Sequence, residues 1–203
     1  MRSSTRRALI AGPAGKIECA VDEPEGRTPR GVALVAHPHP LFGGTLDNKV
    51  VQTLARAFVE LGYTAWRPNF RGVGGSEGRH DEGRGELEDL AAIIEHLKSE
   101  KPVLAGFSFG AAIQAMLAQR LVREGNPASR MVLVGVAVKT LDVPPVAAGT
   151  IVIHGEEDTT VSLADVLAWA RPQDLPVVVV PGADHFFHRR LPILRAIIQN
   201  SWK

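Results

Sequence analysis

Short apolar runs alternate with amphipathic segments along most of the chain. Six of these runs are rich in β-forming residues and almost continuously apolar, which is typical of strands covered on both faces; they are residues 32–37, 64–70, 102–107, 131–138, 150–155 and 177–180. Between them, apolar residues recur at helical spacing in residues 46–61, 85–97, 111–122, 163–169 and 191–198. Because strands and helices take turns, the pattern predicts an α/β fold with a mostly parallel sheet and helices on both faces.

The first 30 residues follow a different pattern. Residues 16–21 predict a strand at the edge of the sheet, and the turn-rich sequence DEPEGRTPRG follows it at 22–31. We expect this edge strand to be antiparallel to its neighbour. No repeat, low-complexity tract or interdomain linker interrupts the rest, and the longest connection without a helical pattern is 140–149. We therefore expect residues 1–203 to form a single domain.

Composition narrows the classes of function. The chain carries 23 Lys and Arg against 22 Asp and Glu, a formal net charge of +1, so it lacks the strong field that would hold nucleic acid or an anionic membrane. The only cysteine, Cys19, cannot form an intramolecular disulfide, which is typical of a reducing compartment. No run approaches the roughly 18 apolar residues of a membrane helix. The apolar run at 8–11 is too short for a secretory signal. We expect a cytoplasmic protein.

A serine lies between two glycines where a predicted strand meets a predicted helix. The sequence PVLAGFSFGAA at 102–112 places Gly106, Ser108 and Gly110 in a G-x-S-x-G pattern. At such a junction this pattern is typical of a nucleophile elbow, in which the glycines make room for a sharp turn and close helix packing. Ser108 is therefore the candidate nucleophile, and its alternative role is that of an ordinary helix N-cap.

A serine hydroxyl needs a base to become nucleophilic, and the base needs a carboxylate to orient it. Loops after two later strands supply both types of residue, HGEEDTTV at 154–161 and PGADHFFHRR at 181–190. In a parallel sheet both loops lie at the same edge as the elbow. The chain order serine, acid, histidine that accompanies this elbow favours Asp158 as the acid and His185 as the base.

Alternatives exist for both residues. Asp158 could instead cap the following helix, and His185 could be a solvated loop histidine. Asp184 is adjacent to His185, so their side chains diverge, and we expect His188 to be helical already. The carboxylates that compete with Asp158 are Glu156, Glu157 and Asp142.

Acyl transfer also needs two donors, usually backbone N–H groups, for the oxyanion. The N–H of Phe109, the residue after the candidate nucleophile, is the first. We expect the second from HPHPLFGGT at 37–45. Both prolines of this loop lack an N–H, so near its start His39 is the favoured donor and Leu41 the alternative.

Two further patterns suggest bound groups, and neither is complete. His37 and His39 could hold a metal, but no third ligand follows at a suitable spacing. Residues 70–78, FRGVGGSEG, resemble a dinucleotide-binding loop, yet Glu77 occupies the third glycine position and no Lys-Ser/Thr pair follows. We expect this segment to shape one wall of the site, with no metal and no cofactor.

Five segments together resemble the α/β-hydrolase superfamily, namely HPHPLFGG, RPNFRGVGGSEG, GFSFG, HGEED and GADHFFH. The match runs from about residue 8 to about residue 200, and the chain is similar to small lidless bacterial serine hydrolases and carboxylesterases related to dienelactone hydrolase. The resemblance implies an α/β-hydrolase sheet of about seven or eight strands and a triad of Ser108, Asp158 and His185. Dienelactone hydrolases have a cysteine nucleophile where this chain has Ser108, and the usual His-Gly start of the oxyanion loop is His37-Pro38 here.

Many superfamily members insert a lid before the strand that corresponds to 150–155, whereas only VKTLDVPPVAAG fills that space here. The resemblance therefore implies an open pocket and hydrolysis of small acyl esters through an acyl-enzyme. A thioesterase or a small peptidase would use the same triad. A non-catalytic binding module on the same scaffold is the remaining hypothesis.

Overall fold

The computed structural model describes residues 5–202 as alternating strands and helices. The strands are β1 (Thr5–Gly12), β2 (Gly15–Asp22), β3 (Val32–Ala36), β4 (Thr64–Pro68), β5 (Val103–Phe107), β6 (Arg130–Val134), β7 (Ile151–Gly155) and β8 (Val177–Val180). The helices are α1 (Lys49–Glu60), α2 (Arg84–His96), α3 (Phe109–Arg123), α4 (Leu163–Ala170) and α5 (Leu191–Asn200). Two short 3-10 helices are η1 (Pro40–Phe42) and η2 (Arg171–Gln173).

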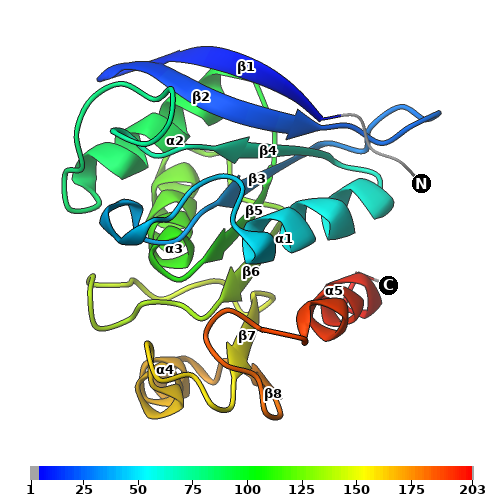
Figure 1. Ribbon diagram of the computed structural model, residues 1–203, viewed down its shortest axis with the longest axis vertical. Coiled ribbons are helices and arrows are strands. Elements are labelled where there is room, and N and C mark those ends of the chain that lie inside the picture. The colour runs from blue at the N-terminus through cyan, green and yellow to red at the C-terminus, as the bar shows by residue number, and fades with distance from the viewer. Residues whose placement is uncertain (1–4, 203) are drawn as a thin grey trace.

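The eight strands form one sheet in the order β1-β2-β4-β3-β5-β6-β7-β8 (Figure 1). Strands β3 to β8 are parallel to one another. Strand β1 is antiparallel to β2, and β2 is antiparallel to β4. The predicted α/β class and the mostly parallel sheet are confirmed.

Helices cover both faces of this sheet. Helices α1 and α5 pack on one face, and α2, α3 and α4 pack on the other (Figure 1). Every residue of the central strand β5 is buried. Val103, Ala105 and Phe107 join the core under α1 and α5, while Leu104 joins the opposite core. Burial on both faces explains why the central strands are continuously apolar in sequence.

The prediction for the edge of the sheet was wrong. The edge strand is β1, and the strand expected at the edge, 16–21, lies within β2 one position further in. Ile10 is the one fully buried residue of β1, whereas its neighbour Leu9 is 61% exposed. The apolar run at 8–11 is short and does not alternate with polar residues as a half-buried strand would, so the sequence pattern did not identify it as a strand.

Several element boundaries also differ from the pattern, for local reasons. Helix α1 begins at Lys49 because the Asn48 side chain accepts hydrogen bonds from the next turn and caps the helix. Strand β6 ends at Val134 rather than at residue 138 because Gly135 has φ of 53° and turns the chain out of the sheet.

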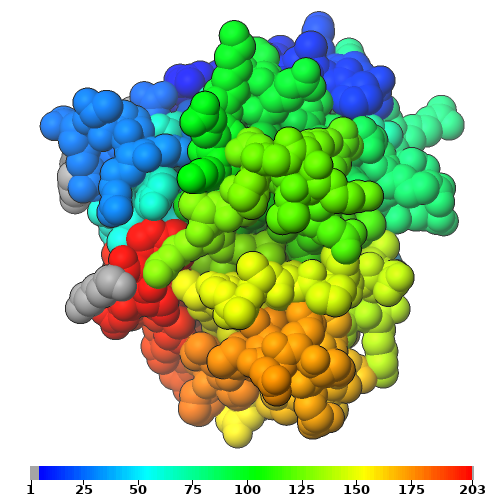
Figure 2. Space-filling view, turned by 180° about the vertical axis from the view of Figure 1, so that it is seen from behind, coloured from blue at the N-terminus to red at the C-terminus, as the bar shows by residue number. Residues whose placement is uncertain are grey.

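The connection between β6 and β7 contains no helix or strand. In the view from behind, yellow residues around 150 form a band between green residues above and orange residues below (Figure 2). No separate lid therefore follows β6 in the part of the chain that the structure describes. Among residues 5–202, no helix combines the length and apolarity needed to cross a membrane.

Candidate active site

The turn between β5 and α3 has the geometry of a nucleophile elbow. Ser108 has φ of 55° and ψ of −117°, a conformation that non-glycine residues rarely adopt. A Cβ atom added to Gly106 would lie 2.5 Å from the carbonyl carbon of Gly110. One added to Gly110 would collide with the carbonyl oxygens of Ala36 and His37. Both glycines are therefore needed for the start of α3 to pack closely against β5 and β3.

The structure brings Ser108, His185 and Asp158 into one hydrogen-bonded chain. The distance from Ser108 Oγ to His185 Nε2 is 3.1 Å, and the distance from His185 Nδ1 to Asp158 Oδ2 is 2.6 Å. All three residues are buried. The Ser108 side chain makes no capping hydrogen bond to α3, so the N-cap alternative does not describe it.

The loop after β8 carries His185 to this position. The Phe107 ring lies 4.8 Å from the His185 ring, centroid to centroid. A Cβ atom added to Gly135 would lie 3.3 Å from His185 Cε1, so a small residue there leaves room for the imidazole. We expected His188 to be helical, but it is not, because α5 begins only at Leu191. Its Nδ1 instead lies 2.6 Å from Asp184 Oδ2 on an exposed turn.

Asp158 receives donors on both carboxylate oxygens. Its Oδ1 accepts the N–H groups of Thr160 at 2.9 Å and Val161 at 2.8 Å, which leaves Oδ2 for His185. Burial by itself would raise the pKa of Asp158, but the hydrogen bonds from His185 and Val161 outweigh burial and hold that pKa below its usual range. Asp158 does not cap the following helix, α4. Ser162 is the cap, and its Oγ accepts the N–H of Asp165.

A second buried histidine, His154, lies behind Asp158 and was not singled out by the sequence. His154 Nε2 is 2.9 Å from the Val161 carbonyl oxygen and 3.5 Å from Asp158 Oδ2. Burial lowers the pKa of His154, so its imidazole is neutral and donates to Val161. His154 is the next-to-last residue of β7, and no motif in the sequence predicts its approach to Asp158.

Two backbone N–H groups are the candidate donors to the oxyanion. Within residues 5–202, neither Phe109 N–H nor His39 N–H has a hydrogen-bond acceptor. The rings of these two residues lie 4.8 Å apart, centroid to centroid. Leu41 N–H, the alternative donor, is 3.2 Å from His39 Nδ1 and donates to it. This arrangement favours His39 over Leu41.

His37 is held on both ring nitrogens. Its Nδ1 is 2.6 Å from the Pro38 carbonyl oxygen, and its Nε2 accepts the N–H of Phe70 at 2.9 Å. Both nitrogens are engaged, so His37 cannot also bind a metal together with His39 in this arrangement. In the described part of the chain, no group of three or more His, Cys, Asp or Glu side chains is placed to hold a metal ion.

The segment that follows β4 lies beside the same site. The Phe70 ring is 4.6 Å from the His37 ring and 5.5 Å from the Phe109 ring. Further along, the His80 ring lies 5.6 Å from the Phe109 ring, and His80 Nδ1 is 2.8 Å from Glu86 Oε1. The sequence predicted a wall here, but not the pairing of His80 with Glu86, because neither residue belongs to the glycine pattern.

The thiol of Cys19 takes no part in the hydrogen-bonded chain of the candidate site. Cys19 lies in β2 and is fully buried. Burial raises the pKa of its thiol to about 12, so the thiol stays protonated and unreactive.

Comparisons with known proteins identify the family to which this fold belongs. The family described as alpha/beta hydrolase fold matches residues 39–149, more than half of the chain. The chain therefore belongs to the α/β-hydrolase fold family and is a hydrolase.

Individual relatives share the fold over almost the whole chain. XC6422 from Xanthomonas campestris, a serine hydrolase without a lid, has a TM-score of 0.87 and is 35% identical, covering 99% of this chain and 94% of its own. An α/β serine hydrolase homologue from Coxiella burnetii has a TM-score of 0.83 and is 37% identical, covering 98% of this chain and 97% of its own. The uncharacterised protein RP471 of Rickettsia prowazekii is 34% identical over 195 residues, 87% of this chain and 79% of its own.

Proposed function

We propose that this protein is a serine hydrolase that cleaves small acyl esters, with Ser108 as nucleophile, His185 as base and Asp158 as the acid that orients the base. The observation that carries the proposal is the hydrogen-bonded chain from Ser108 Oγ through His185 to Asp158 Oδ2, which begins on a strained elbow. Strain at a buried residue persists only where the surrounding structure imposes it, and it concentrates at functional sites.

The first step forms an acyl-enzyme. His185 Nε2 takes the hydroxyl proton of Ser108 as Oγ forms a bond to the ester carbonyl carbon, and the carbonyl electron pair moves onto oxygen. The N–H groups of Phe109 and His39 stabilise this oxyanion. When the carbonyl re-forms, the bond to the alkoxide breaks, and the alkoxide takes the proton from His185. Asp158 accepts from His185 Nδ1 throughout and stabilises the imidazolium.

The second step repeats the first with water as the nucleophile. His185 takes a proton from water as the water oxygen forms a bond to the acyl carbon. When the carbonyl re-forms, the bond from that carbon to Ser108 Oγ breaks, the acid leaves, and Ser108 Oγ takes the proton from His185. No step requires electrons to enter or leave the protein, so acid, base and hydrogen-bond donors suffice for the reaction.

The short connection between β6 and β7 supports the proposed substrate class. Because this connection contains no helix or strand that could form a lid, we expect little protein surface to be available to bury a long acyl chain. Acetyl and butyryl esters are therefore expected to be better substrates than esters of long-chain acids. A panel of p-nitrophenyl esters of increasing chain length measures this directly, and a preference for the long chains would contradict the proposed class. Including thioesters and amides in the same panel separates an esterase from a thioesterase or a peptidase.

The decisive experiment is covalent labelling by a fluorophosphonate, which requires an activated serine but no knowledge of the substrate. Wild type is expected to be modified at Ser108, identified by peptide mass spectrometry, and Ser108→Ala is expected to lose both labelling and ester turnover. Ser129→Ala is the matched control, since Ser129 lies just before β6, away from the elbow. Unlabelled but folded wild type would refute the proposal and favour a non-catalytic binding module.

A further inference from the structure

The peptide that joins Pro38 to His39 contains the proposed second oxyanion donor. A peptide unit is planar and trans, so its C=O and N–H groups lie in one plane and point in opposite directions. Any contact that fixes the direction of the Pro38 carbonyl therefore also fixes the direction of the His39 N–H. His37 makes such a contact, because its Nδ1 lies 2.6 Å from the Pro38 carbonyl oxygen.

The other ring nitrogen determines which tautomer of His37 is present. Nε2 lies 2.9 Å from the backbone nitrogen of Phe70. A backbone N–H can only donate, so Nε2 must be unprotonated in order to accept it. In a neutral imidazole the proton then resides on Nδ1, which donates to the Pro38 carbonyl.

We propose that His37 is a positioning residue for acyl transfer: Phe70 N–H selects its Nδ1-protonated tautomer, and Nδ1–H aims the Pro38–His39 peptide so that His39 N–H meets the oxyanion. The inference rests on the proposed function, since it assigns the way in which one oxyanion donor is oriented. His37 itself does not touch the substrate in this role.

The surroundings of His37 keep it neutral and immobile. The residue is fully buried. Burial lowers its pKa to about 4, although the hydrogen bond to Pro38 acts in the opposite direction. The Phe70 ring packs edge-on against the imidazole at an interplanar angle of 63°. A single tautomer is therefore maintained at neutral pH.

The loop is also closed tightly around the Pro38 carbonyl. A Cβ atom added to Gly44 would collide with that carbonyl oxygen, so the far side of the loop returns to within contact of its start. Gly44 N–H donates to the His39 carbonyl oxygen at 3.1 Å. The Pro38 carbonyl oxygen thus lies close to Gly44 of its own loop as well as within hydrogen-bond distance of His37.

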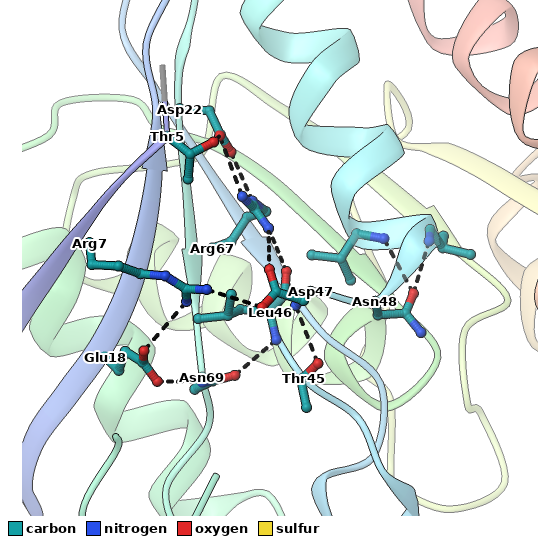
Figure 3. Close-up of polar contacts among 12 residues, drawn as sticks. Thr5, Arg7, Glu18, Asp22, Thr45, Leu46, Asp47, Asn48, Arg67 and Asn69 are labelled. Carbon is teal, nitrogen blue, oxygen red and sulfur yellow. Dashed lines mark hydrogen bonds and ion pairs between the residues drawn. The ribbon is translucent and has the colours of Figure 1, made fainter. Parts of the chain in front are cut away.

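The far end of this loop is anchored at Leu46 by Arg67 and Asn69, where the chain leaves β4 (Figure 3). Leu46 N–H donates to Asn69 Oδ1 at 2.8 Å, and the Leu46 carbonyl oxygen accepts from Arg67 Nη1 at 2.6 Å. Arg67 is in turn paired with Asp22 on β2, with Nε 2.8 Å from Oδ2. Arg67, Asn69 and Phe70 all lie where the chain leaves β4, so one short segment holds both ends of residues 37–46.

Two substitutions separate the two hydrogen bonds of His37. In His37→Asn, the shorter side chain places an amide N–H where Nδ1–H lay but cannot reach Phe70. In His37→Gln, the longer side chain places its carbonyl oxygen where Nε2 lay and leaves the Pro38 carbonyl without its donor. Each variant leaves one buried backbone group unpaired, so the urea midpoints of the two variants are expected to fall by similar amounts.

Although the two variants should lose similar stability, their activities are expected to differ, because only His37→Asn keeps a donor to the Pro38 carbonyl. With p-nitrophenyl acetate, kcat of His37→Gln should fall about 100-fold, which is the scale of losing an oriented oxyanion donor, whereas His37→Asn should stay within about tenfold of wild type. KM should change little in either variant, because the donor acts on the transition state. Equal losses of kcat in the two variants would overturn the inference.

Nitrogen-15 NMR of the wild type provides a test that needs no variant to fold. His37 is expected to show a protonated Nδ1 and an unprotonated Nε2 at pH 7, and the opposite tautomer would overturn the inference. Failure of the proposed function gives a different result: wild type would lack both ester turnover and fluorophosphonate labelling at Ser108, and this inference would fall with it. Normal wild-type labelling with equal variant losses would overturn only the role of His37.

Discussion

Acid should destabilise this protein partly through His37, whose imidazole is buried and accepts a backbone hydrogen bond. Burial lowers its folded-state pKa to about 4, whereas an unfolded chain has a histidine pKa of about 6.5. Between these two values the unfolded chain binds a proton that the folded protein does not. The stability of the protein therefore rises with pH across this window. The contribution of His37 is fully present above about pH 6.5 and is lost as the pH falls toward 4.

The gap between the two pKa values sets the size of the effect. Over the whole window His37 is expected to cost about 3 kcal/mol of unfolding free energy, and about 2 kcal/mol of that is lost by pH 5. A loss of this size is a substantial part of the roughly 5–15 kcal/mol that stabilises a typical domain.

Urea unfolding of wild type and His37→Asn at pH 7.5 and pH 5 isolates the contribution of His37. The variant retains the other groups that titrate, including His154 and Asp158, so their contributions cancel in the difference. Wild type is expected to lose about 2 kcal/mol more than the variant between the two pH values. Equal losses would mean that His37 titrates normally when folded, and the reasoning from burial would be refuted.

Two further substitutions probe the elbow and the acid. Asp158→Asn should reduce kcat by about 10³- to 10⁴-fold with little effect on KM, because His185 loses its orienting carboxylate. Steady-state kinetics measure this, with the exposed Asp142→Asn as the control. An unchanged kcat would show that Asp158 has no part in the mechanism. Gly110→Ala should cost about 1–3 kcal/mol of stability, since its methyl group collides with backbone oxygens. Thermal unfolding should show no such loss for Gly149→Ala, whose added methyl group contacts nothing, and equal stability of both variants would contradict the packing argument.

The sequence predicted the parts of the fold that are buried on two sides. Strands such as β5 appear as continuous apolar runs because both faces are covered, so their positions followed from hydrophobicity alone. Strand β1 could not be found in this way, since it buries only Ile10 completely. The predicted end of β6 was wrong because of backbone conformation, since Gly135 has a positive φ and ends the strand.

The candidate site was predictable where chemistry depends on chain order. Ser108, Asp158 and His185 each follow a strand that ends at the same sheet edge, so topology alone brings them near one another. The partners of His37 could not be predicted, because its contact to Phe70 spans 33 residues and depends on the path of a backbone N–H. Hydrogen bonds of this kind are set by tertiary structure and leave no local pattern.

The buried pair of Asp22 and Arg67 links the outer part of the sheet to the loop beside the nucleophile. Removing the Arg67 charge alone would break this buried ion pair and leave the Asp22 carboxylate buried without its cation, at a cost of about 3–5 kcal/mol. Removing the Asp22 charge would leave Arg67 with Asp47 as its ionic partner, 3.5 Å from Nη1 to Oδ1. We therefore expect these two positions to vary together during evolution and to change least where the loop at 37–46 keeps its length. In related sequences where positions 22 and 67 change together but the length of this loop does not, we expect the oxyanion donor to be held in another way.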